Sequence, residues 1–402
     1  MNDVIVIGAG PAGNVAARDL ASAGYRVSVV DWRTSIGDKL CTGIVGVECA
    51  DRFPVPQSYI YHRAKSARIF SPSGREYPVV AADNQALIVD RQAYVMSVAQ
   101  EAMDHGATYH LGVKVANIDI DSDGVVVHTR TGNSTSTLQS ELVIISSGFG
   151  SPLIEMAGLH RGKSNDFMLG TQMEVEVREQ RDTEVYVGDH IAPQAFGWLV
   201  PLDSSRALIG LMSRNGLNGH LEHFHQSLAD RGRVGRPISP ARRWGIPLRP
   251  IPRTFADRTL VTGDSAGFAK PTTGGGIFYA LLSGQMAAQA AASALMNGDL
   301  SANRLKTYET RWKEVIGNEL RIGYGARLLF ESMRESQREH LMELFLSEGV
   351  LRDLITAPGF SFDWHGRTIL KTIMHREMGP VIRSFGPLVA PFFARLLRST
   401  FS

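Results

Sequence analysis

The feature that most constrains the fold is a glycine pattern at the start of the chain. The apolar run 4–7 is typical of a strand buried on both faces. The Ala-rich stretch 14–23 favours a helix that ends at Gly24, and a second strand-like run, 26–31, follows it. Between the first strand and the helix stand three glycines spaced G-x-G-x-x-G, namely Gly8, Gly10 and Gly13. The sequence therefore predicts a βαβ unit at the N-terminus.

Each glycine of this pattern has its own physical role. Gly8 permits a tight turn, Gly10 lets the backbone approach a pyrophosphate, and Gly13 lets the helix pack closely on the sheet. We assign Ala12 to the same loop, where the helix N-terminus offers free N–H groups to phosphates. Asp31 ends the second strand, where a carboxylate accepts a hydrogen bond from a ribose hydroxyl. A chance glycine cluster would lack this strand–helix–strand context, so we expect a bound dinucleotide.

A downstream segment favours FAD over NAD as that dinucleotide. Gly263 and Asp264 follow the strand-like run 260–262, and an aspartate there can bind the ribityl chain of a flavin. The alternative is an ordinary strand–helix turn with Asp264 as the N-cap. NAD enzymes need no second anchor of this kind, so the two motifs together favour a flavin.

Two further features are expected beside the cofactor. A helix predicted over 274–296 begins with Gly274, Gly275, Gly276 and Ile277, where a flat ring or an anionic oxygen can approach the backbone. The alternative is a flexible turn. Arg91 begins another predicted helix and can bind a pyrophosphate bidentately; the alternative is a surface salt bridge.

The two cysteines, Cys41 and Cys49, match no zinc or iron–sulfur spacing, so we expect no metal site. Cys41 lies in a loop bounded by Gly37 and Gly43 and could face the flavin. A small buried hydrophobic role is the alternative, and it is the one that we assign to Cys49.

The middle of the chain predicts a second, antiparallel sheet. Strand-like runs over 167–212 include one that carries Phe196, Trp198 and Pro201, which either fill a core or line an apolar substrate pocket. The expected fold class is α/β, a Rossmann-type FAD-binding domain with an antiparallel-sheet substrate domain and a helical C-terminal region. The expected domains are 1–165 plus 249–300 for FAD, 166–248 for substrate with part of 50–90 contributing, and 301–402 for the helices.

Charge and hydropathy limit the location and the partners. Lys and Arg number 42 against 40 for Asp and Glu, which is too balanced to indicate nucleic acid binding. The chain opens directly with a core strand and has no uninterrupted bilayer-length apolar run, so we expect a cytoplasmic protein. The apolar, arginine-containing stretch 381–401 either docks on the core or anchors the protein peripherally to the inner face of the membrane.

Several of these motifs together resemble the geranylgeranyl reductase family, flavoproteins that share the para-hydroxybenzoate hydroxylase fold. The resemblance covers residues 1 to about 355. Thr42, Val200 and Leu202 depart from the family pattern, in which glycine, an aromatic residue and lysine are common. The matching segments are 7–13, the Cys-x-Gly loop at Cys41, 263–267, 271–277, 196–201, and the helical residues Tyr308, Glu309, Arg311, Trp312, Glu319 and Leu320.

The resemblance implies an FAD-dependent reductase that saturates isolated double bonds of a prenyl chain on a lipid, quinone or chlorophyll precursor. It implies Cys41 as the proton donor or positioning group. Because FAD uses the single G-x-G-x-x-G unit and the sequence shows no second one, we expect NAD(P)H that binds transiently or a ferredoxin-like protein as the electron donor. Two alternatives remain open at this point. One is a flavin-dependent monooxygenase or halogenase, and the other is a flavin electron carrier.

Overall fold

The computed structural model forms two compact units, and each is assembled from three separate segments of the chain. Unit 1 comprises Met1–Lys39, Asp90–Phe167 and Ile246–Leu320. Unit 2 comprises Leu40–Val89, Met168–Gly245 and Arg321–Ser402. The structure describes residues 1–160, 162, 166–178, 182–214, 216–347, 351, 353, 355 and 360–374.

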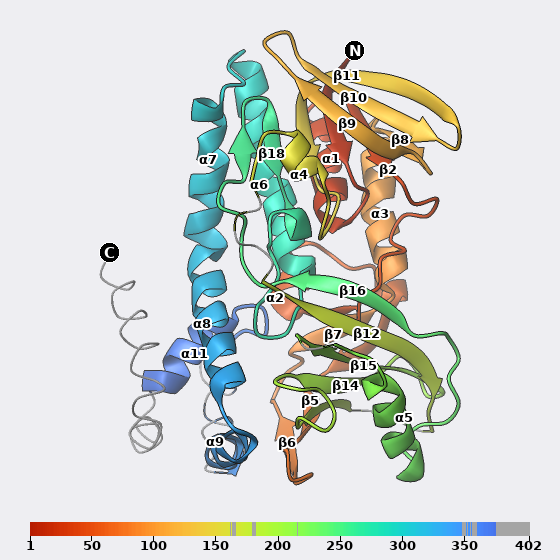
Figure 1. Cartoon of the computed structure of the whole chain (residues 1–402), viewed down its shortest axis with the longest axis vertical. Coiled ribbons are helices and arrows are strands. Elements are labelled where there is room, and N and C mark those ends of the chain that lie inside the picture. Colours follow the sequence, from red (N-terminus) through yellow and green to blue (C-terminus); the bar gives the residue numbers. More distant parts are fainter. Residues whose placement is uncertain are drawn as a thin grey trace. The chain divides into compact units, whose positions relative to one another are not determined.

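A largely parallel sheet forms the centre of unit 1 (Figure 1). Its parallel strands lie in the order β8-β2-β1-β11-β18, with β1 at the centre, and β10 and β9 extend β11 as an antiparallel meander. The central strands are apolar because they are covered on both faces. The strands are β1 Asn2–Ile7, β2 Val27–Asp31, β8 Thr108–Leu111, β9 Lys114–Ile120, β10 Val125–Thr131, β11 Ser134–Ile145, β17 Phe255–Ala256 and β18 Thr259–Val261.

Small residues allow the helices of unit 1 to pack closely. Helix α1 contacts both α3 and α6. A Cβ atom on Gly284 of α6 would lie 2.2 Å from the carbonyl oxygen of Ala12 in α1, so only glycine permits this approach. The helices of unit 1 are α1 Pro11–Ser22, α3 Arg91–Asp104, α4 Leu153–Met156, the 3₁₀ helix η2 Gly263–Ser265, α6 Ile277–Met296, α7 Ala302–Trp312 and the π-helix η3 Lys313–Gly317.

Unit 2 contains a seven-stranded sheet in the order β16-β12-β15-β14-β13-β5-β6 and a small sheet in the order β3-β7-β4. The β12–β15, β15–β14, β14–β13 and β5–β6 pairs are antiparallel, and the β13–β5 pair is parallel. Its strands are β5 Ser66–Phe70, β6 Glu76–Val80, β12 Phe167–Glu176, β13 Thr183–Val187, β14 Phe196–Pro201, β15 Arg206–Ser213 and β16 Arg242–Pro247. The small sheet and the helices are β3 Ile44–Gly46, β4 Ile60–Ala64, β7 Ala86–Val89, α2 Val47–Arg52, η1 Gln57–Tyr59, α5 His220–Asp230, α9 Glu335–Ser347 and α11 His365–Met374; α8 Asn318–Ser332 begins in unit 1 and continues in unit 2.

The expected fold class is confirmed, with a Rossmann-type sheet, an antiparallel sheet and a helical C-terminal region. The helix expected from Gly274 begins three residues later, at Ile277, because Gly274 takes a left-handed φ of 75° and ends a turn instead. The domain boundaries remain a prediction. In the compact units, 40–89 groups with the antiparallel sheet, and 301–320 groups with the Rossmann-type sheet.

The apolar stretch 381–401 lies outside the described residues. Within the part of the chain that the structure describes, no helix is both long and apolar enough to cross a membrane.

Candidate flavin and substrate sites

Two of the three glycines in the N-terminal loop are required by the protein itself. Gly8 has a left-handed φ of 112°, and a Cβ atom on it would lie 2.3 Å from the carbonyl oxygen of Ser146. A Cβ atom on Gly13 would lie 2.0 Å from the carbonyl oxygen of Gly8. Because both clashes are with backbone atoms, which cannot swing away, these glycines set the turn and the packing of α1 on β1.

Gly10 differs from these two glycines. Its φ of −85° suits any residue, and a Cβ atom on it would meet no atom within 4 Å. The chain therefore does not itself require glycine at this position, and the space beside it lies at the N-terminal end of α1. This open space fits the pyrophosphate of a dinucleotide, which would be held by the first N–H groups of the helix. Ala12, by contrast, lies in the first turn of α1 and is buried where α6 approaches it.

Asp31 lies against the same loop. Its carboxylate accepts hydrogen bonds from the main-chain N–H of Ala9 (2.7 Å) and of Arg33 (2.8 Å), which fixes its position at the end of β2. Each carboxylate oxygen can accept a further bond, so Asp31 can still bind a ribose hydroxyl.

Asn14 is a supporting residue that the sequence did not indicate. Its fully buried amide donates to the carbonyl oxygens of Ala9 (3.2 Å) and Val95 (3.1 Å), and Tyr109 donates to its Oδ1 (3.0 Å). These bonds tie the glycine loop to α3. The sequence offered one signal for this role, since Asn14 is polar at a position of α1 where the pattern calls for an apolar residue.

The second predicted anchor, Asp264, lies in η2 directly after β18. Its carboxylate pairs with Lys39, and a Cβ atom on Gly276 would lie 3.0 Å from its Oδ1. Asp264 therefore lies beside the glycine turn that precedes α6. Lys39 belongs to no recognisable motif, so the sequence did not indicate it as a site residue. These polar groups fit the ribityl chain and ring of a flavin, for which the sequence assigned Gly263, Asp264, Gly274, Gly275, Gly276 and Ile277.

Arg91 donates from its guanidinium to the carbonyl oxygens of Gly37 and Lys39. It thereby orders the loop that leads to Cys41, a role different from the pyrophosphate contact expected from the sequence. The pyrophosphate contact stays a prediction.

Helix α7 packs against β17 and β18, the strands that lead to the Asp264 turn. Tyr308 donates to the carbonyl oxygen of Val261 (2.9 Å), and Glu309 accepts from the N–H of Thr254 (3.0 Å). Trp312 donates to the hydroxyl of Thr254 (2.8 Å). Burial raises the pKa of the Tyr308 phenol well above its usual range, so it remains a neutral donor. The residues that carried the family resemblance in this helix thus hold β18 in place.

In unit 2, the structure brings two tryptophans together on one face of the large sheet. The Trp198 indole lies over Gly210, where a Cβ atom would be 2.4 Å from its Cζ2. Trp244 lies over Gly170 in the same way, at 2.7 Å. The two rings meet edge to face with centroids 6.2 Å apart, and Phe196 meets Trp198 at 6.1 Å. We call Phe196, Trp198 and Trp244 the aromatic face. Trp244 and the two glycines were not predicted, because their pairing depends on strand order.

The loop that carries Cys41 is linked to this aromatic face by the side chain of Gln172. Gln172 of β12 accepts hydrogen bonds from Thr42 (3.1 Å) and from the indole N–H of Trp198 (3.2 Å). Cys41 itself is partly exposed, whereas Cys49 is buried. The structure therefore brings the cysteine loop together with Phe196 and Trp198.

Pro201 lies on the opposite face of β14. Side chains alternate along a strand, so residues 197, 199 and 201 point away from the aromatic face. Gly197 illustrates this, since a Cβ atom there would meet Ile191 and Phe224 of the covering layer. A part for Pro201 in the substrate pocket remains a prediction, but it does not share a face with Trp198.

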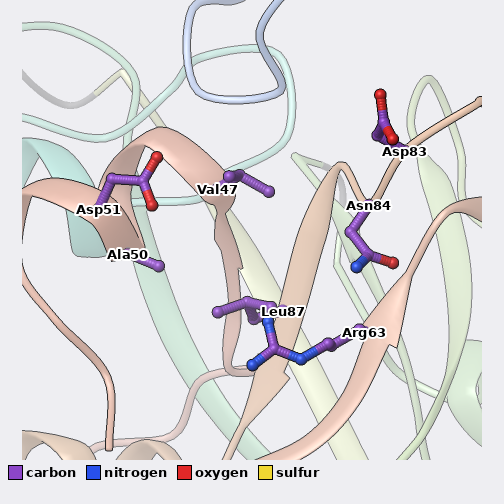
Figure 2. Close-up of a pocket in the computed structure, with 7 residues that line it drawn as sticks. All are labelled: Val47, Ala50, Asp51, Arg63, Asp83, Asn84 and Leu87. Carbon is purple, nitrogen blue, oxygen red and sulfur yellow. The ribbon is translucent and has the colours of Figure 1, made fainter.

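A surface pocket of ≈ 290 Å³ lies beside α2 in unit 2 (Figure 2). Its lining carries two carboxylates and a guanidinium, and Arg63 also bonds Gln57 (2.6 Å). Burying these charged side chains against a hydrocarbon chain would cost free energy, so we assign no prenyl substrate to this pocket. The lining residues are Val47, Ala50, Asp51, Arg63, Asp83, Asn84 and Leu87.

Comparisons with known proteins bear on the whole arrangement. Residues 2–187 match the family model described as pyridine nucleotide-disulphide oxidoreductase. The digeranylgeranylglycerophospholipid reductase of Methanocaldococcus jannaschii is 28% identical over 354 residues, which cover 85% of this chain and 90% of that protein. The chain is thus similar over most of its length to digeranylgeranylglycerophospholipid reductases. The resemblance expected from the motifs is thus confirmed, as is the class of flavin-dependent oxidoreductase.

Solved structures agree with this relationship at the level of the fold. A geranylgeranyl bacteriochlorophyll reductase-like protein from Thermoplasma acidophilum has a TM-score of 0.85 and 23% identity, covering 96% of this chain and 99% of that one. A flavin-dependent halogenase has a TM-score of 0.67 and 19% identity, covering 92% and 76%. The halogenase is the more distant of the two.

Proposed function

We propose that this chain is an FAD-dependent reductase that saturates isolated double bonds of a geranylgeranyl-type chain on a lipid. The observation that carries the proposal is the hydrogen-bonded link between the Cys41 loop and the aromatic face of unit 2. Reduction of an isolated alkene needs an apolar binding surface and a nearby proton source. The aromatic face offers the apolar surface, and Cys41 in the adjoining loop is the candidate proton source. The relationship to a lipid prenyl reductase over most of the chain supports the same substrate class.

FAD, when bound and reduced by the electron donor, would supply the hydride that saturation requires. Gly10 and the α1 N-terminus would hold its pyrophosphate in the turn that Gly8 and Gly13 set, and Asp31 would bind its ribose. Asp264 and the turn Gly274–Gly276 would hold its ribityl chain and ring. Lys39 pairs with Asp264 and would orient that carboxylate.

Cys41 is the proposed proton donor. Isolated alkenes accept hydride poorly, so a proton must reach one carbon as hydride reaches the other. The Sγ–H bond breaks, a C–H bond forms, and the thiolate regains a proton from solvent. Phe196, Trp198 and Trp244 would seat the hydrocarbon and exclude water from it.

We propose NAD(P)H or a ferredoxin-like protein as the electron donor. The single G-x-G-x-x-G unit is assigned to FAD, so either donor would bind transiently. Anaerobic stopped-flow measurement of flavin bleaching with each donor separates the two.

The decisive test is anaerobic turnover with a panel of prenyl lipids, quinones and chlorophyll precursors, followed by mass spectrometry. We expect a gain of two hydrogens for each saturated double bond. Rapid oxygen consumption in air on adding substrate, with no such gain under anaerobic conditions, would instead establish the monooxygenase or halogenase alternative.

Peripheral membrane contact through the C-terminus is part of this proposal, since prenyl lipids reside in bilayers. The stretch 381–401 carries phenylalanines interspersed with Arg383, Arg395 and Arg398. We expect salt-sensitive binding to anionic liposomes that is lost on deleting 379–402. Equal binding by a folded truncated protein would locate the contact elsewhere.

A further inference from the structure

Gln172 occupies an unusual place in unit 2. Its side chain is 1% exposed, and its Oε1 accepts two hydrogen bonds, from Thr42 Oγ1 (3.1 Å) and from Trp198 Nε1 (3.2 Å). An indole N–H can only donate, so the amide oxygen, and not the nitrogen, must face Trp198. This fixes the orientation of the amide and leaves the Thr42 hydroxyl as the second donor.

Strand register explains why these groups meet. Gln172 of β12 pairs with Gly210 of β15, and Gly210 in turn pairs with Trp198 of β14. The three residues form one row across the sheet. Because Gly210 has no side chain, the indole lies across the middle strand and reaches the amide two strands away. Any other residue at position 210 would separate Trp198 from Gln172.

The same amide reaches the cysteine loop. Thr42 directly follows Cys41, so its hydroxyl fixes the backbone next to the thiol. Farther along, Asp363 accepts from the N–H groups of Gly46 (3.2 Å) and Cys49 (2.8 Å). Between this attachment and Cys41, the Thr42–Gln172 bond holds the loop against the aromatic face.

We propose that Gln172 is a positioning residue that sets Cys41 against the aromatic face by accepting from Thr42 and Trp198 through one oxygen. This inference rests on the proposed function, and it adds to the site a residue that transfers neither the hydride nor the proton. Both donors share a single acceptor, so the loop and the indole move together. Small displacements matter because proton transfer to carbon requires close alignment of the thiol and the alkene.

The test compares four variants of the FAD-bound protein: Gln172→Leu, Thr42→Val, Thr42→Ser and the double variant Gln172→Leu/Thr42→Val. Leu and Val keep the approximate size of the side chain and remove the bond, whereas Ser keeps the donor. The first readout is the rate at which iodoacetamide alkylates Cys41, followed by peptide mass spectrometry. Cys49 is 0% exposed and serves as the internal control for global unfolding.

We expect Gln172→Leu and Thr42→Val each to speed Cys41 alkylation about fivefold, the factor typical of one lost hydrogen bond. The double variant should alkylate no faster than Gln172→Leu alone, because Gln172→Leu already removes the bond that Thr42→Val removes. Thr42→Ser should stay within about twofold of the parent. Additive effects, unchanged alkylation in both single variants, or a Thr42→Ser rate equal to that of Thr42→Val would overturn the proposal.

The second readout is prenyl-lipid turnover, in which Gln172→Leu should lower kcat about tenfold and change KM little, since alignment rather than binding is lost. A parent protein that reduces no prenyl lipid refutes the proposed function, and alkylation still decides whether Gln172 positions the loop. An unchanged kcat in a variant with faster alkylation overturns the catalytic importance of that position.

Discussion

Glycines in the two units leave room beside the backbone for different groups. In unit 1, Gly10 borders open space, and no atom lies within 4 Å of an added Cβ. In unit 2, the space above Gly210 is filled by Trp198 and that above Gly170 by Trp244. The first glycine leaves room for a ligand, whereas the other two leave room for indoles of the protein itself.

This difference shows how a glycine can be assigned a role. A glycine with ordinary φ and empty surroundings is unexplained by the fold, and a ligand is the simplest reason for it. A glycine whose missing Cβ is replaced by an indole is explained by packing. Gly10 therefore supports a bound cofactor, whereas Gly170 and Gly210 are explained by the packing of the aromatic face.

The largest expected effect separates Gly10 from its neighbour Gly13. Gly10→Val should fold but retain no detectable FAD, because the side chain would occupy the pyrophosphate position. Flavin released by denaturation and identified by chromatography measures retention, and circular dichroism reports folding. Gly13→Ala is the contrasting variant and should fail to fold, since its Cβ would strike the carbonyl oxygen of Gly8. Full FAD occupancy in Gly10→Val would place the phosphates elsewhere.

The next effect concerns the chemistry assigned to unit 2. Cys41→Ser should retain FAD and lower the single-turnover rate of double-bond reduction about 10²- to 10⁴-fold, the range for removing a general acid. Cys49→Ser is the matched control and should reduce substrate at nearly the parent rate. Equal single-turnover rates for Cys41→Ser and the parent would remove Cys41 from the mechanism.

A smaller effect tests the packing role of Gly210. Gly210→Ala should lower the free energy of unfolding by about 1–3 kcal/mol, because the methyl group meets both Trp198 and the carbonyl oxygen of Thr171. Chemical denaturation followed by tryptophan fluorescence measures it. Gly317→Ala is the control, since its nearest neighbour lies at an ordinary 3.6 Å. Similar stability of the two variants would show that the indole does not depend on Gly210.

The smallest effect concerns the far end of the cysteine loop. Asp363 supplies the N-cap that α2 lacks, since the N-cap residue Gly46 has no side chain. Asp363→Ala should cost about 1 kcal/mol of stability. Thermal unfolding measures this loss, and hydrogen exchange at Cys49 should rise with it. An unchanged exchange rate would mean that α2 is stable without the cap.

Local sequence determined the elements of both units. The βαβ unit, Asp31 and the strands of the second sheet follow from periodicity and turn residues that act within a few positions. The flavin-related glycines were identified for the same reason, because each has its meaning in a strand–turn–helix context. The relationship to the geranylgeranyl reductases was likewise visible in short motifs.

Only the tertiary structure decided which side chains meet. Thr42 and Gln172 are 130 positions apart, and Cys49 and Asp363 are 314 positions apart. Lys39 meets Asp264 across 225 positions. The packing of segments that are distant along the chain creates these pairs, and no periodicity encodes them. The sequence by itself therefore determined the cofactor loop and the candidate thiol. The packing of distant strands and helices decided how that thiol is held, because a buried polar group must find its partner wherever the fold supplies one.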